Sequence, residues 1–192
     1  CDVANAITAK GMAMLDAPVS GGVGGAKQGT LTIMAGGEAD DFERCRPALE
    51  TMGKRVVHVG ALGAGQTIKL VNQMIGGGTM ALIGEALVLA KAAGADLKVA
   101  TEIIGASSGN STVFQSRAEK FLLADQYQPN FTTELMRKDF SLAIDLAHGL
   151  GVATPVAAAA LQQYTVAMNL GHAKDDFSSV AKVCEQAAGV KL

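Results

Sequence analysis

The fold is decided by one long helical stretch, QTIKLVNQMIGGGTMALIGEALVLAKAA, which occupies residues 66–93. Its apolar residues recur on almost every side, and a helix with no polar face lies at the centre of a domain or at an oligomer interface. Three successive glycines, Gly76 to Gly78, each cost roughly 1 kcal/mol in a helix relative to alanine. We therefore expect another helix or a ligand to approach the backbone closely at this point.

The segments before and after this helix differ in their pattern of apolar and turn-forming residues. After it, helical spacing predicts helices over residues 97–104, 112–123, 133–150, 155–169 and 177–188. Before it, turn signals alternate with β-branched runs, which predicts a helix over 4–9, strands over 14–19 and 29–35, a helix over 40–52 and a strand over 55–59. The sequence thus predicts an α/β segment over residues 1–62, followed by an all-helical domain over residues 63–192 with one long central helix.

The composition argues against nucleic acid and against a membrane as binding partners of the chain. The chain of 192 residues is 49% hydrophobic and only 4% aromatic, and its net charge is −2, so it lacks the basic surface that nucleic acid requires. The apolar stretch over residues 70–92 contains Asn72, Gln73, Glu85 and Lys91, which argues against a membrane helix.

The three cysteines, Cys1, Cys45 and Cys184, are far apart in the sequence. Their spacing indicates neither a disulfide framework nor a metal site. A reducing compartment, the cytoplasm, is the default inference.

Lys69 is the first candidate for chemistry, because it lies one turn into the apolar helix. Asn72 and Gln73 follow three and four residues later, which places an ammonium group and two amides on one helix face. Poorly hydrated surroundings lower the pKa of a lysine toward the range useful for proton transfer. In the alternative, Lys69 extends its ammonium group into solvent near the helix end, and spacing alone favours that alternative.

The Pro18-Val-Ser-Gly-Gly22 stretch is the second candidate, a turn predicted to end a strand. The hydroxyl of Ser20 and the backbone N–H groups of Gly21 and Gly22 could together hold a carboxylate. A plain strand-ending turn is the alternative. Asp16 either orients this turn or is an ordinary acid at the end of a strand.

Two further motifs have simple explanations when taken alone. Lys138 and Asp139 lie on a predicted amphipathic helix, where a solvated charge pair is the usual outcome. The stretch at residues 105–109, GASSG, matches the G-x-S-x-G pattern of serine hydrolases with Ser107 as nucleophile. That pattern needs a strand before it, whereas residues 97–104 have helical spacing, so we reject a hydrolase.

Considered together, four motifs resemble the β-hydroxyacid dehydrogenase family in order along the chain: LDAPVSGG at 15–22, GTLTIMAGG at 29–37, GAGQTIKLVN at 63–72 and KD at 138–139. The family includes 3-hydroxyisobutyrate dehydrogenase and tartronate semialdehyde (2-hydroxy-3-oxopropionate) reductase. The resemblance implies the tail of a Rossmann-type dinucleotide-binding domain over 1–62. A helical substrate and oligomerisation domain, like the C-terminal domain of 6-phosphogluconate dehydrogenase, follows over 63–192.

The resemblance also implies a role for each candidate residue. Lys69 is the catalytic residue, and Lys138 contacts the cofactor, NAD or NADP. The substrate-binding residues are Ser20, Gly21, Gly22, Asn72 and Gln73. The Asn-Gln pair is more typical of tartronate semialdehyde reductase than of 3-hydroxyisobutyrate dehydrogenase. No metal is implied.

The implied function is an oxidoreductase that interconverts a small 3-hydroxyacid and its semialdehyde, in a homodimer or homotetramer. One departure stands out, since no G-x-G-x-x-[GA] turn that cradles the pyrophosphate follows a strand in these residues. We therefore expect the natural protein to continue upstream, and the chain alone to bind dinucleotide poorly and not to turn over. A non-catalytic helical interaction module of the same fold is the alternative.

Overall fold

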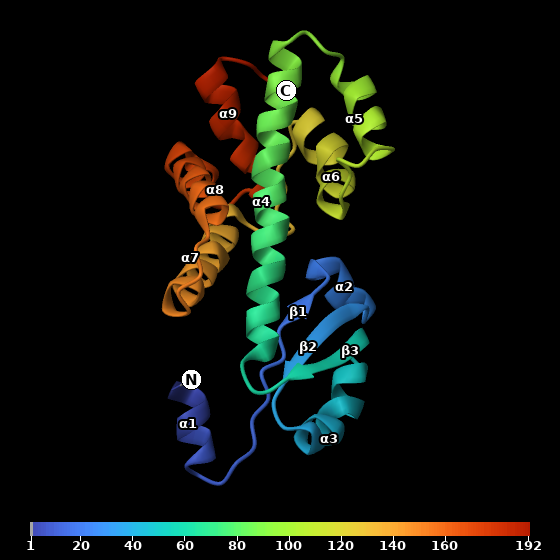
Figure 1. Cartoon of the computed structure of the whole chain (residues 1–192). Helices are drawn as coiled ribbons and strands as arrows, with labels where there is room; N and C mark the ends of the chain where they lie inside the picture. The colour runs from blue at the N-terminus through green and yellow to red at the C-terminus, as the bar shows by residue number, and fades with distance from the viewer. Residues whose placement is uncertain (1) are drawn as a thin grey trace. The chain divides into compact units, whose positions relative to one another are not determined.

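The structure, a computed structural model, describes residues 2–192, so the expectations about Cys1 lie outside the described residues. The chain forms two compact units, one ending at Asn72 and the other running from Gln73 to Leu192 (Figure 1). These units divide inside the long helix, and the expected domain boundary at residues 62 and 63 stays a prediction.

The first unit contains a small mixed sheet with helices. Its elements are α1 (Asp2–Thr8), β1 (Val19–Ser20), α2 (Gly22–Gln28), β2 (Leu31–Gly36), α3 (Ala39–Glu50), β3 (Gly53–Gly60) and the start of α4 (Ala64–Ala92). β1 pairs antiparallel with β2, and β2 pairs parallel with β3 through the crossover helix α3. Ile33 and Ala35 of β2 and Phe42 of α3 are fully buried between these elements.

The strand predicted over residues 14–19 is shorter in the structure, where β1 covers only Val19–Ser20. The preceding segment still runs along β2, because Asp16 exchanges backbone hydrogen bonds with Gly36 and the Pro18 carbonyl accepts one from the Met34 N–H at 3.0 Å. Proline has no N–H to return to Met34, so the ladder is incomplete there. The segment is extended but does not form a continuous strand.

The turn predicted to end in Gly21 and Gly22 is followed by a helix that the sequence did not predict. The chain turns at Gly21, where φ is 132°, and then forms the short helix α2. Gly29 ends this helix with φ at 63°, a left-handed conformation that favours glycine. Glycine is a poor helix former, so the composition of α2 gives no signal for a helix.

The second unit is all-helical, as predicted. After α4 it contains α5 (Leu97–Gly105), α6 (Thr112–Arg117), the π-helix η1 (Ala118–Leu123), α7 (Thr133–Gly149), α8 (Pro155–Ala167), the π-helix η2 (Met168–His172), the 3₁₀ helix η3 (Phe177–Val180) and α9 (Ala181–Ala188). In Figure 1, α7, α8 and α9 lie on one side of α4, and α5 and α6 lie on the other. The predicted helices over 112–123 and 155–169 each change from α to π geometry toward their C-terminal end.

The expected close approach at the three glycines is found at one of them. A Cβ atom on Gly77 would overlap the Phe140 ring and lie 2.7 Å from the Met136 sulfur, whereas at Gly78 it would meet nothing within 4 Å. Gly84 is a second contact, because a Cβ there would lie 2.9 Å from Ala181. Glycine at positions 77 and 84 therefore lets α7 and α9 pack against the backbone of α4.

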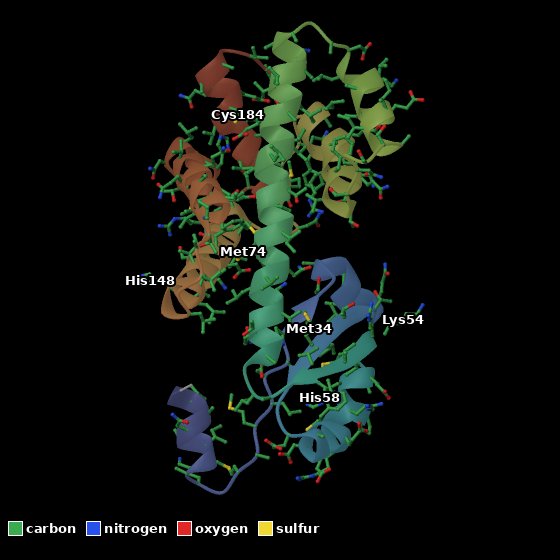
Figure 2. The ribbon with its side chains drawn as sticks, in the orientation of Figure 1. Met34, Lys54, His58, Met74, His148 and Cys184 are labelled. Carbon is green, nitrogen blue, oxygen red and sulfur yellow. The ribbon has the colours of Figure 1, made fainter. Side chains whose placement is uncertain are left out.

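By length and composition α4 could cross a membrane, a criterion that core helices of water-soluble proteins also meet. Met80 and Leu87 of this helix are fully buried in the main hydrophobic cluster of the second unit. Figure 2 shows Met74 on the same helix, and its side chain packs against that cluster. These contacts give α4 the role of a core helix.

Candidate functional site

The Ser-Gly-Gly segment connects β1 to α2 through a backbone that requires glycine. Ser20 is half-buried at the end of β1, where it pairs with Thr32 of β2. Gly21 and Gly22 follow with φ of 132° and 61°, and both residues are exposed. A Cβ atom at Gly22 would meet nothing within 4 Å, so the positive φ is what favours glycine there. The segment thus presents a hydroxyl and accessible backbone.

Asp16 joins this part of the chain to the start of α4. One carboxylate oxygen, Oδ1, accepts a hydrogen bond from the Gly63 N–H at 2.6 Å, and Oδ2 accepts one from the Gln66 N–H at 2.7 Å. The first N–H groups of a helix have no partner within the helix, and a carboxylate there also interacts favourably with the helix dipole. Asp16 is therefore the cap of α4, a role that neither of the two sequence interpretations of this residue predicted.

Lys69 and Asn72 lie in the second and third turns of α4. Because α4 is continuous from Ala64, their spacing of three residues places them on one helix face, as predicted. Lys69 is half-buried and Asn72 is exposed. Lys69 also follows Gly65 by one turn on the same face, and Gly65 is the residue against which Pro18 and Asp16 pack.

The second unit carries the other two candidate residues, and Asp139 joins them. Gln73 is 8% exposed, and its Nε2 donates a hydrogen bond of 2.9 Å to Asp139 Oδ2. Lys138 is exposed, and its Nζ lies 2.9 Å from Asp139 Oδ1. The aspartate itself is buried, so the pair is not the fully solvated one that spacing alone favoured.

The sequence therefore did not predict the hydrogen-bonding roles of two aspartates, Asp16 and Asp139. The signal for Asp16 was a charged residue inside an apolar run, LDAPV, followed much later by the Gly63-Ala-Gly65 start of a helix. The signal for Asp139 was weaker, since a buried and an exposed carboxylate look the same in an amphipathic pattern. Only the packing of α7 against α4 distinguishes them.

Ser107 and two of the histidines have local partners. Ser107 follows helix α5, as predicted, and its Oγ donates a hydrogen bond of 2.6 Å to the Ile103 carbonyl, as a helix-terminal serine does. His58, labelled on β3 in Figure 2, stacks on Phe42 with ring centroids 5.0 Å apart. His172 contacts Asp175 at 2.8 Å. Among the described residues, His, Cys, Asp and Glu side chains form no group of three that could hold a metal ion.

A dinucleotide needs cations and a phosphate-binding turn after a strand. Lys138 supplies an exposed cation. The glycines at 21–25 follow a strand of only two residues and lie at the cap and start of α2, and a Cβ atom at Gly25 would lie 3.2 Å from the Leu31 side chain.

Two protein-family models match the chain. Residues 63–184 match the NAD-binding domain of NADP-dependent 3-hydroxyisobutyrate dehydrogenase, and residues 2–60 match the NAD-binding domain of 6-phosphogluconate dehydrogenase. Both describe NAD-binding domains, so the expected cofactor class, NAD or NADP, is confirmed for the family.

The chain is also similar to curated dehydrogenases. It is 40% identical to 2-(hydroxymethyl)glutarate dehydrogenase of Eubacterium barkeri, covering 95% of this chain and 61% of that protein. It is 39% identical to 3-hydroxyisobutyrate dehydrogenase of Pseudomonas aeruginosa, covering 94% of this chain and 63% of that protein. The chain thus spans about three fifths of the length of these relatives.

Solved structures confirm the expected fold class. The chain matches Mycobacterium tuberculosis 3-hydroxyisobutyrate dehydrogenase, determined with L-serine, with a TM-score of 0.88 at 34% identity, over 95% of this chain and 65% of that one. It matches the Salmonella typhimurium 3-hydroxyisobutyrate dehydrogenase with a TM-score of 0.85 at 37% identity, over 95% and 64%. The architecture is the α/β tail of a Rossmann-type domain followed by an all-helical domain.

Proposed function

The chain belongs to the β-hydroxyacid dehydrogenase family, and from this premise we propose that it carries the substrate-binding and proton-transfer residues of an NAD(P)-dependent oxidoreductase. The reaction interconverts a small 3-hydroxyacid and its semialdehyde. The observation that carries the proposal is the junction at Asp16, which fixes the start of the Lys69 helix beside the segment that ends in Ser-Gly-Gly.

Simple geometry supports placing Lys69 near Ser20. A Cβ atom on Gly65 would lie 3.0 Å from Pro18 Cδ, so these two positions mark where the helix touches the extended segment that leads into β1. From there Lys69 is one turn along α4, about 6 Å, and Ser20 is two residues along the strand, about 7 Å. The chain runs the same way along β1 and along the first turns of α4 (Figure 1). Because Lys69 and Ser20 lie at similar distances from the same contact and in the same direction, the two residues should lie beside each other.

The chemistry follows from these groups. The Ser20 hydroxyl and the N–H groups of Gly21 and Gly22 bind the carboxylate of the substrate. Lys69, as the neutral amine, accepts the proton of the substrate hydroxyl during oxidation, and as the ammonium it returns that proton during reduction. Asn72, one turn further along the same face, donates a hydrogen bond to the reacting oxygen. Bound NAD or NADP supplies the hydride chemistry at the adjacent carbon.

In the second unit, Lys138 is the proposed contact to the cofactor. Its exposed ammonium group lies 2.9 Å from the buried carboxylate of Asp139, which restricts the motion of the lysine side chain. An ammonium group has three donor hydrogens, so the others stay able to bind a cofactor. Gln73 stays a proposed substrate ligand, and its amide is also anchored on Asp139.

The assembly and the compartment are further parts of the proposal. Ile75, Leu82 and Leu89 of α4 are each about two-thirds exposed, which supports a homo-oligomer that covers this face. A cytoplasmic location agrees with the free thiols of Cys45 and Cys184.

The test replaces Lys69 by alanine in the whole protein and measures NAD(P)H absorbance with tartronate semialdehyde and 3-hydroxyisobutyrate as separate substrates. Loss of the proton-transfer group should lower kcat by roughly 100-fold or more. Lys91→Ala is the control, because Lys91 is exposed in the last turn of the same helix. A folded K69A variant with nearly unchanged turnover would contradict the proposal, and a wild-type protein without turnover would favour the non-catalytic module.

A further inference from the structure

We propose that Asp16 is a positioning residue for catalysis, which sets the distance between Lys69 and the Ser-Gly-Gly segment. The inference rests on the proposed function and adds a residue that is in neither the proton-transfer set nor the substrate-binding set. The acid acts through its hydrogen bonds to the start of α4.

The contacts of Asp16 reach across the sequence. The carboxylate lies four residues before Ser20, and its two acceptors bind N–H groups 47 and 50 residues later in the chain. Both bonds are short, at 2.6 and 2.7 Å, as expected when an ionised oxygen accepts from a backbone amide. One side chain thus ties the strand that leads to Ser20 to the helix that carries Lys69.

The surroundings of the carboxylate leave little space for adjustment. A Cβ atom on Gly36 would lie 2.5 Å from Asp16 Oδ1 and 2.7 Å from the Ala61 carbonyl. A Cβ atom on Gly65 would overlap the Met34 carbonyl and lie 2.7 Å from Asp16 Oδ2. Even a methyl group is therefore excluded at two positions around Asp16. The end of β2, the extended segment and the first turn of α4 meet at a tightly packed point.

Tight packing at this point matters for rate because Lys69 lies only one turn beyond it. Misplacement of a catalytic group by about 1 Å can cost roughly 100-fold in rate, even when the change lies outside the chemistry. A looser helix start would shift Lys69 relative to Ser20 and leave both side chains intact. The expected consequence is a lower kcat with an unchanged KM for NAD(P).

The test compares Asp16→Asn with Asp96→Asn in the whole protein. Asp96 is a matched control, because it caps α5 in the same way and accepts from the N–H groups of Lys98 at 2.8 Å and Val99 at 3.2 Å. Asp96 is not among the residues assigned to the site. Both variants should lower the melting temperature, since each loses the charge of a helix cap.

At a temperature where both variants are folded, D16N should lower kcat by roughly tenfold or more, and D96N should leave kcat unchanged. If D16N does not fold, Asp16→Ser replaces it, because serine is a favourable helix cap and its shorter side chain reaches fewer of the two amides. The same loss of kcat is expected for that variant.

A double variant separates this inference from the proposed function. In the K69A background, D16N should cause no further loss of kcat, because a residue that acts through Lys69 has nothing left to position. A full D16N effect in that background, or a D16N kcat equal to that of D96N, overturns the inference while K69A still supports the function. A K69A variant with unchanged turnover overturns the function itself.

Discussion

The hydroxyl group of Tyr164 donates a hydrogen bond of 2.9 Å to the carbonyl oxygen of Gly77, in the middle of α4. The tyrosine is completely buried, and its ring packs against Phe140 with centroids 5.5 Å apart. Tyr164→Phe removes only the donor, so the free energy of unfolding should fall by about 1 kcal/mol. Urea unfolding measures this change, and an unchanged m-value shows that the variant exposes the same surface on unfolding as the wild type. A variant as stable as the wild type would show that this hydrogen bond contributes nothing net.

Neighbouring glycines in α4 should respond to alanine in opposite directions. Gly77→Ala places a methyl group in overlap with the edge of the Phe140 ring and against Met136, and should destabilise the protein by about 1–3 kcal/mol. Gly78→Ala meets nothing within 4 Å and should stabilise it by up to about 1 kcal/mol through helix propensity. Thermal or urea unfolding of the two variants checks the contrast. Changes of the same sign would disprove the packing argument.

The buried carboxylate of Asp139 should matter far more than an exposed acid on the same helix. Asp139→Ala removes an acceptor from the buried Gln73 amide and the anion beside Lys138, which should cost about 1–3 kcal/mol. Asp145→Ala is the control, because Asp145 is exposed on α7 and should change stability by less than about 0.5 kcal/mol. Equal unfolding free energies for the two variants would contradict the structural role of Asp139.

Both tyrosines should resist ionisation in alkali. Burial raises the pKa of Tyr127 to about 12 and raises the pKa of Tyr164 well above its ordinary value of 10.0. The folded state therefore holds these protons more tightly than the unfolded state does, so their contribution to stability is complete below pH 10. The contribution of Tyr127 is lost as the pH rises from 10 through 12, and that of Tyr164 is lost above pH 10. Tyrosinate absorbance should not develop near pH 10 while the chain stays folded. An ordinary titration near pH 10 in the folded protein would contradict this prediction.

Sequence reasoning succeeded where a segment determines its own structure. The apolar spacing of α4 and the β-branched run of β2 follow directly from residue periodicity, and both elements lie within a few residues of their predicted bounds. The helices predicted to start at residues 97 and 177 do start there, and Asp96 and Asp176 accept backbone hydrogen bonds just before them. Such signals are local, so a single sequence carries them.

Sequence reasoning failed where distant segments decide the outcome. The glycines of α2 carry no helical propensity, and the short strand β1 is limited by the missing N–H of Pro18. The partners of Asp16 lie at positions 63 and 66, and only the folded chain shows that they meet. In the candidate site, the residue types and the shared face of Lys69 and Asn72 were predictable, whereas the contacts that Asp16 makes in the first unit and Asp139 makes in the second were not.

The helix α4 passes without interruption through the division between Asn72 and Gln73. Proteases cut exposed, extended segments, and this division offers them none, because it lies more than two turns inside a helix of 29 residues. Cutting the gene at the same place would leave each fragment with a severed helix end and several backbone groups lacking their partners. The chain is built from two units that cannot be prepared separately by clipping a linker, so dissecting its chemistry depends on point substitutions.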